Sequence, residues 1–163
     1  MYPMRLTQST AQGLVSLPSP NNLPLWTAGE LRLLDEAIDY AARVCHGTVC
    51  EFLASPSRRE LDGSRFIEMA VEFFIPPSSL AQFADELDRA MMRRSLGYSS
   101  ARRSGNAGPV RVVALSASIF HQWRMAWKID PQQQRDRRWS QDRQMLDQVL
   151  LYANDGWREL FTA

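Results

Sequence analysis

Apolar residues recur along this chain with two different periods. After Thr27 and Glu30, which have the spacing of a capping box, they fall at Leu31, Leu34, Ile38, Ala41 and Cys45. This spacing places them on one face of a helix that is expected to end near His46-Gly47. Residues 65–75 instead alternate, with Ile67, Met69, Val71, Phe73 and Ile75 on one face and Glu68 and Glu72 on the other. Such alternation predicts a β-strand.

The same reasoning predicts the remaining elements. Strands are expected at residues 48–54 and 109–115. Helices are expected at residues 78–96 and 140–152, and a further helix that contains Phe120 and Trp123 is expected to begin at residue 116 or 118. The expected helix caps are Ser78, Ser116 or Ser118, and Ser140. Residues 99–109 are small, polar and rich in glycine, which is typical of a mobile loop.

The order of these elements predicts a small α+β domain. We expect a mostly antiparallel sheet of three to four strands that is covered by helices. Residues 1–26, which include the proline-rich stretch LPSPNNLP, form an extended lead-in, and residues 27–163 form the single domain. If Gly13–Leu17 in the lead-in is an edge strand, the order becomes ferredoxin-like.

The stretch from Ser116 to Arg143 has the most unusual composition. It holds three of the five tryptophans, the one lysine (Lys128) and a triple glutamine followed by arginines. The spacing of Phe120, Trp123 and Trp127 predicts a stripe buried against the sheet. Two interpretations of the polar residues 132–138 follow: a solvated arginine-rich face, or a loop that binds an anion or a partner.

A set of residues in this stretch matches a known pattern. It consists of a Phe-led helix, a loop of the form Gln-His/Tyr-Lys-x-Pro-Arg, and Ser-Asn-Asp-Arg at the start of the last helix. The matching positions are Phe120, Trp123, Gln133, Arg138, Ser140, Asp142 and Arg143. The departures are Gln134 in place of His or Tyr, Arg135 in place of Lys, and Arg137 in place of Pro.

The pattern resembles the C-terminal domain of the auxin-responsive, Gretchen-Hagen-type acyl acid-amido synthetases, a family of adenylate-forming enzymes. The resemblance extends more weakly back to about Leu31 and implies a small sheet flanked by helices. In that family the domain is a mobile lid that brings a loop cation to the acyl phosphate. The resemblance therefore implies a catalytic role for Arg135, with Gln133, Gln134, Arg138 and Lys128 as binding residues. Arginine keeps the charge of the usual lysine, but its planar fork needs more room.

The resemblance also bears on cofactors and partners. The large nucleotide-binding domain of the synthetases is not part of this sequence, so we expect the chain alone to bind no cofactor. ATP and Mg would come with an adenylating protein or domain, and activity of the ligase type would require that partner.

Charge is distributed unevenly along the chain. Residues 1–88 carry six arginines against twelve acidic residues, net −6, while residues 89–163 carry twelve arginines and one lysine against six acidic residues, net +7. This asymmetry suits a phosphate-facing or nucleic-acid-facing end, or two halves that attract each other, and we favour the second. Nucleic-acid binding is disfavoured because stacking aromatics must be exposed, whereas Trp123 and Trp127 have inward spacing.

Cysteine, histidine and apolar runs restrict the remaining classes. Cys45 and Cys50 are not in a metal or redox spacing, and Cys50 is expected to be a buried, inert thiol. With His46 and His121 as the two histidines, no metal site can be assembled convincingly. No stretch approaches the roughly 20 apolar residues of a membrane span, so we expect a cytoplasmic protein with no membrane partner.

Two functional hypotheses of different class follow. The first is a stand-alone, lid-like module of an acyl-adenylating amide synthetase that works with, or descends from, a separate ATP-binding partner. The second is a non-catalytic binding or assembly subunit. Under either hypothesis a homodimer is a further possible partner. A third, a small independent enzyme, would need a cleft on the sheet lined by Glu68, Glu72 and arginines. We otherwise expect these two glutamates on a solvent face or paired with arginines.

Overall fold

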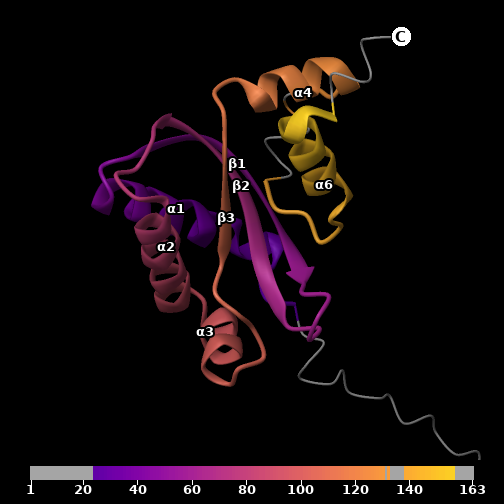
Figure 1. The fold of residues 1–163 in the computed structure, drawn as a ribbon. Coiled ribbons are helices and arrows are strands. Elements are labelled where there is room, and N and C mark those ends of the chain that lie inside the picture. The colour runs from indigo at the N-terminus through magenta and orange to yellow at the C-terminus, as the bar shows by residue number, and fades with distance from the viewer. Residues whose placement is uncertain (1–23, 131, 133–137, 157–163) are drawn as a thin grey trace, which may run out of the picture.

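The structure, a computed structural model, describes residues 24–130, 132 and 138–156. Its elements are η2 (Ala28–Glu30), α1 (Leu31–Val44), β1 (Thr48–Arg58), β2 (Arg65–Ile75), α2 (Leu80–Arg94), α3 (Leu96–Arg103), β3 (Arg111–Leu115), α4 (Ile119–Trp127), α6 (Gln144–Leu151) and the π-helical turn η3 (Tyr152–Gly156). Figure 1 shows three layers, with α1 and α2 on one side of the sheet and α4 and α6 on the other. The predicted α+β class is confirmed.

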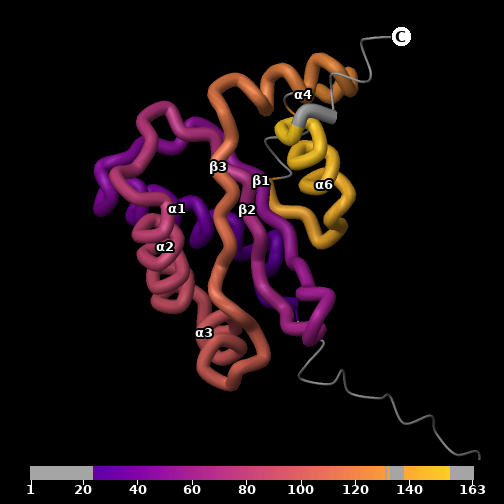
Figure 2. The backbone as a smooth tube through the Cα atoms, in the orientation of Figure 1, coloured from indigo at the N-terminus to yellow at the C-terminus, as the bar shows by residue number. Residues whose placement is uncertain are grey.

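The sheet has the strand order β1-β2-β3. β1 and β2 form an antiparallel pair, whereas β2 and β3 are parallel and are connected through α2 and α3, a path that Figure 2 traces. The possible edge strand at Gly13–Leu17 lies outside the described residues, and the described strands do not have the ferredoxin-like order. In that order the strands corresponding to β2 and β3 are separated by another strand, but here they are hydrogen-bonded directly.

The larger core lies between the sheet and helices α1 and α2. The apolar stripes of the two helices are buried there against the odd-numbered residues of β2. The predicted capping box is confirmed, with the backbone N–H of Thr27 donating to Glu30 at 3.1 Å. Trp26, which belongs to the expected lead-in, is fully buried and contacts Tyr98 edge-to-face at a centroid distance of 5.9 Å. A buried side chain of this size contributes roughly 1.5–3 kcal/mol.

The second core lies on the opposite face of the sheet. Leu53, Ala70, Phe120, Trp123, Leu146 and Val149 are all buried in it. The predicted burial of Phe120 and Trp123 is therefore confirmed. The prediction for Trp127 is wrong, because 46% of its surface is exposed. Trp127 is the last residue of α4, and Lys128, with a left-handed φ of 53°, turns the chain away there.

Glu68 and Glu72 lie on this covered face and are both buried, so the expected solvent face is wrong. Glu72 accepts hydrogen bonds from the backbone N–H groups of Ser118 (2.8 Å) and Phe120 (3.2 Å). Ser118 is the N-cap residue of α4, but its side chain makes no capping bond, so the carboxylate of Glu72 replaces the expected serine cap.

The alternative expectation, pairing with arginine, is confirmed for Glu68. Its carboxylate lies 2.5 Å from Arg143 and 3.5 Å from Arg111. Ala70, between the two glutamates on this face, is fully buried beneath the helices. This packing does not support the cleft that a small independent enzyme would need.

The expected mobile loop at residues 99–109 is wrong, because α3 occupies residues 96–103. Ser95 caps it by accepting from the N–H of Tyr98 at 3.2 Å. Asp88 of α2 then accepts from the hydroxyl of Tyr98 (2.6 Å), from the guanidinium of Arg102 and from the N–H of Val110 (3.1 Å). This buried network joins α2, α3 and the start of β3. Burial, followed by the charge of the Asp88 carboxylate and its hydrogen bond, raises the pKa of Tyr98.

Two further helix starts differ from the sequence prediction. Ser79, rather than Ser78, caps α2 by accepting from the N–H of Gln82. The last helix begins at Gln144, whose N–H donates to Asp142 at 2.9 Å, while the expected cap Ser140 donates to the carbonyl of Asp142. None of the helices in the described ranges is both long and apolar enough to cross a membrane.

Candidate functional site

The structure describes the two ends of the segment in which the sequence placed its site. Gln133, Gln134 and Arg135 lie outside the described residues, so their roles stay predictions. Arg138 and Lys128 are described, and the structure does not bring them into one site. Lys128 is exposed at the end of α4 and lines a shallow depression with His121, Met125 and Tyr152.

Arg138 is held by contacts with two other elements. Its carbonyl accepts from the N–H of Ala54 on β1 at 2.8 Å, and the N–H of Ser140 donates back to the carbonyl of Ala54 at 3.0 Å. Its guanidinium donates to Asp35 on α1 at 2.6 Å and lies 5.5 Å from the ring centroid of Phe52. One end of the predicted loop is therefore fixed against the edge of the sheet.

Arg138 lines a cleft of about 800 Å³ between α1, β1 and α4. We call it the arginine cleft; its other lining residues are Asp35, Ile38, Asp39, Val49, Cys50, Glu51, Phe52 and Arg124. Arg124 of α4 pairs with Glu51 of β1, and the side chains of this pair are 14% and 19% exposed. Two guanidinium groups and three carboxylates thus line one cleft.

The Asp35 carboxylate is a costly partner for Arg138. Burial raises the pKa of Asp35 above its ordinary value, and Arg138 opposes this shift without cancelling it. Burial therefore makes the ionised form of the Asp35 side chain less favourable than it is in water.

Cys50 is exposed in this cleft, so the prediction of a buried thiol is wrong. The pairing of β1 with β2 shifts register between Val49 and Glu51, which makes Cys50 the extra residue of a bulge. Desolvation and the neighbouring carboxylates of Glu72 and Glu51 raise the pKa of the Cys50 thiol, despite the opposing effect of Arg124. A nucleophilic thiolate is therefore not favoured here.

The charges of the cleft pair with one another, Arg138 with Asp35 and Arg124 with Glu51, and Asp39 is the third carboxylate. Within the described ranges, no group of three or more His, Cys, Asp or Glu side chains is placed to hold a metal ion. The sequence analysis missed Arg124, Asp35 and Glu51. A signal for Glu51 was available in the sequence. Glu51 is two residues before Leu53 on β1, so both side chains lie on the same face of the strand, and this face is covered by helices. A carboxylate on a covered face needs a cation from the helix above it.

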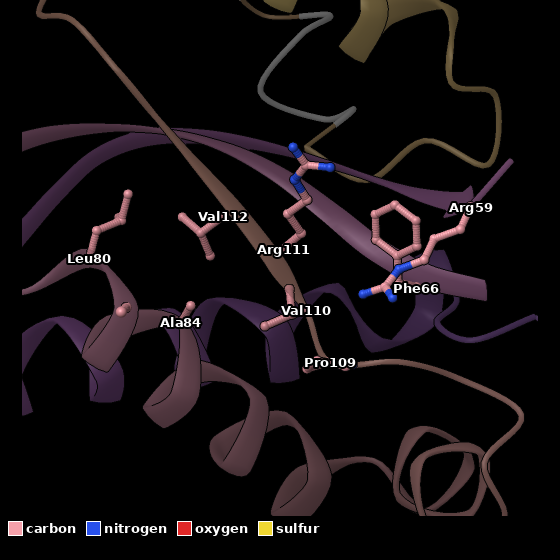
Figure 3. Close-up of a pocket in the computed structure, with 9 residues that line it drawn as sticks. Arg59, Phe66, Leu80, Ala84, Pro109, Val110, Arg111 and Val112 are labelled. Carbon is pink, nitrogen blue, oxygen red and sulfur yellow. The ribbon is translucent and has the colours of Figure 1, made fainter. Parts of the chain in front are cut away.

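A second concave region lies between α2 and β3 (Figure 3). It is a groove of about 430 Å³ whose apolar walls are formed chiefly by Leu80, Ala84, Val110 and Val112. Arg59 and Arg111 lie at its rim. Leu80, the first residue of α2, is 37% exposed in this groove.

Comparison with known proteins supports the fold. The chain is similar to part of a solved GH3.15 acyl acid amido synthetase, with a TM-score of 0.57 and 12% sequence identity, over 74% of this chain and 24% of that one. The fold is GH3-like. The chain spans about a quarter of the length of that synthetase. No family model matches the sequence, and no curated protein matches it either.

Proposed function

We propose that this chain is a lid-like module of an acyl-adenylating amide synthetase, which joins an acyl acid to an amine or amino acid. It works in the cytoplasm with, or descends from, an adenylating protein or domain that binds ATP and Mg. The observation that carries the proposal is the position of the arginine cleft. The cleft adjoins Arg138, which aligns with the loop arginine of the synthetases, in a fold similar to part of one of them.

The chemistry assigned to this module is stabilisation of negative charge. Arg135 supplies the catalytic cation to the acyl-phosphate region, and Gln133, Gln134 and Lys128 assist binding. Arg138 adds a second cation, which Asp35 holds until the anion arrives. The contacts of Arg138 and Ser140 with Ala54 support a fixed base for this segment. An end of the loop that is anchored to the sheet restricts the positions that the cation of Arg135 can occupy.

A second candidate function is a non-catalytic binding or assembly subunit. The apolar groove between α2 and β3 favours it, because exposed apolar side chains such as Leu80 are typical of interaction surfaces. Under this alternative the arginines of the cleft contribute to binding but not to turnover.

Pyrophosphate exchange into ATP tests the first proposal. The purified chain alone should show no exchange with any acyl acid, because the ATP site lies on the partner. Addition of the chain to an adenylating protein encoded beside it should then restore amide formation. Robust exchange by the isolated chain would contradict the proposal. Binding to that protein with no effect on its turnover would favour the assembly function instead.

A further inference from the structure

The two edges of the sheet differ in how they are protected against pairing with another strand. The β1 edge has a bulge at Cys50, a proline without an N–H at position 56, and backbone bonds from Ala54 to Arg138 and Ser140. Bulges, prolines and covering segments are the usual means by which proteins prevent edge-to-edge association.

Within the part of the chain that the structure describes, the β3 edge has none of these features. The register of β3 with β2 is continuous over Arg111–Leu115, without a bulge or a proline. Among the described strands, none pairs with the far side of β3. Figures 1 and 2 show β3 running in front of the other strands, with no labelled element across it. Its one charged residue, Arg111, already lies 3.5 Å from Glu68 of the same chain.

Exposed apolar surface lies directly beside this edge. Ala114 is exposed, Val112 and Val113 are half-buried, and Leu80 of α2 is 37% exposed across the groove of Figure 3. A strand edge with free backbone groups and apolar flanks is a template for a further strand. From these observations we infer that β3 pairs antiparallel with β3 of a second copy of this chain, forming a dimer with a continuous six-stranded sheet.

The register of the sheet makes this edge complementary to itself. A two-fold axis at Val113 places Val113 opposite Val113, and Val112 opposite Ala114 of the second copy, so apolar side chains meet apolar side chains. Arg111 falls opposite Leu115 of the second copy. We call the line along which the two β3 strands pair the seam. Leu115 is in register with Glu72 on β2, so the row of residues that crosses the seam consists of Glu68 and Arg111 of one copy followed by Leu115 and Glu72 of the second copy. The two arginines lie at opposite ends of the paired β3 strands, each beside Glu68 on β2 of its own copy.

The two-fold axis also preserves the layers of the fold. Rotation about an axis perpendicular to the sheet keeps α2 of both copies on the same face, above the seam. The apolar walls of the two grooves, Leu80 and Ala84 from each copy, then cover the paired Val112 and Ala114 side chains. The groove is thus the place where the helical layers of two copies meet. This inference does not depend on the proposed function.

Sedimentation equilibrium of the full chain, combined with a matched pair of variants, tests the dimer. The wild-type chain should be dimeric, and Ala114→Lys should be monomeric at every concentration at which the wild type is dimeric, because a charge is buried in the seam. Ala126→Lys, at an exposed position on α4, should leave the dimer unchanged. Circular dichroism should show that both variants remain folded.

A cross-link tests the register itself. In a Cys50→Ser background, Val113→Cys places the introduced thiols opposite each other, within the Cα separation that a disulfide allows, and oxidised glutathione should yield a covalent dimer. Leu151→Cys, exposed on α6, should not cross-link. A monomeric wild type overturns the inference, as does a dimer that survives Ala114→Lys. A chain that becomes dimeric only after deletion of residues 1–23 also overturns it, since that segment would then be the occupant of the edge.

Discussion

The guanidinium of Arg138 donates a 2.6 Å hydrogen bond to the carboxylate of Asp35, a residue 103 positions earlier in the chain. The bond joins the end of the predicted loop to the first helix. Both side chains are about one-third exposed, so the bond itself contributes little to stability, of the order of 0.2–1 kcal/mol. It holds the guanidinium of Arg138 at the arginine cleft.

The Asp35 carboxylate should make stability depend on pH. Its pKa is raised in the folded state, so its stabilising contribution is fully present below the ordinary Asp value and is lost as pH rises through the folded-state pKa. Relative to Asp35→Asn, the wild type should therefore lose stability as pH rises above the ordinary pKa of an aspartate. Urea unfolding across this range measures the difference.

The Arg138→Met variant provides the control for that prediction. Arg138 lowers the pKa of Asp35 by charge and by hydrogen bonding, so removal of its guanidinium should raise this pKa further. The loss of stability with rising pH should then be larger. An NMR titration of the Asp35 side chain reads this change directly. A downward shift in Arg138→Met would refute the assignment of the pair.

Glu72 should be the principal cap of α4. Glu72→Gln should lower the free energy of unfolding by roughly 1–2 kcal/mol, because a buried charge-assisted cap is lost. Ser118→Ala removes no capping bond and should cost less than about 0.5 kcal/mol. Chemical denaturation of the two variants distinguishes the caps, and the reverse ranking would show that the serine is the true cap.

The Asp88 network should be the most sensitive polar position of the larger core. Asp88→Asn should cost roughly 3–5 kcal/mol, because it leaves the partly buried Arg102 guanidinium without its charge partner. Tyr98→Phe should cost about 1 kcal/mol. The control is Asp85→Asn at an exposed position of the same helix, which should change stability by less than about 0.5 kcal/mol. Thermal unfolding of the three variants gives the ranking, and equal effects of both aspartate substitutions would count against the network.

Local periodicity was sufficient to predict α1 and β2, because each has a clear apolar face and a clear boundary. It could not reveal α3, since the residues around Ser99 are individually poor helix formers. That helix depends on the Ser95 cap and on Asp88, a residue of the preceding helix. Periodicity also placed Glu68 and Glu72 on one face of β2 correctly, but an alternating strand does not say whether its second face is solvated or covered.

The candidate site shows the same limit. The sequence identified Arg138 through its neighbours in the loop, but its partner Asp35 is separated from it by most of the chain. Arg124 follows the buried Trp123 on α4, and nothing local pairs it with Glu51 on β1. Such long-range charge pairs are determined by the packing of helices on the sheet, which spacing within one element does not encode.

The central claim is that this module supplies cations to a reaction whose ATP site lies on a partner. The most direct measurement is the amide-forming turnover of the adenylating partner with the wild-type chain, with Arg135→Ala and with Arg103→Ala, a control on α3. We predict that turnover requires the chain, falls roughly 100-fold or more with Arg135→Ala, and is unchanged with Arg103→Ala. Turnover that is the same with and without the chain, or that both variants support equally, would contradict the account.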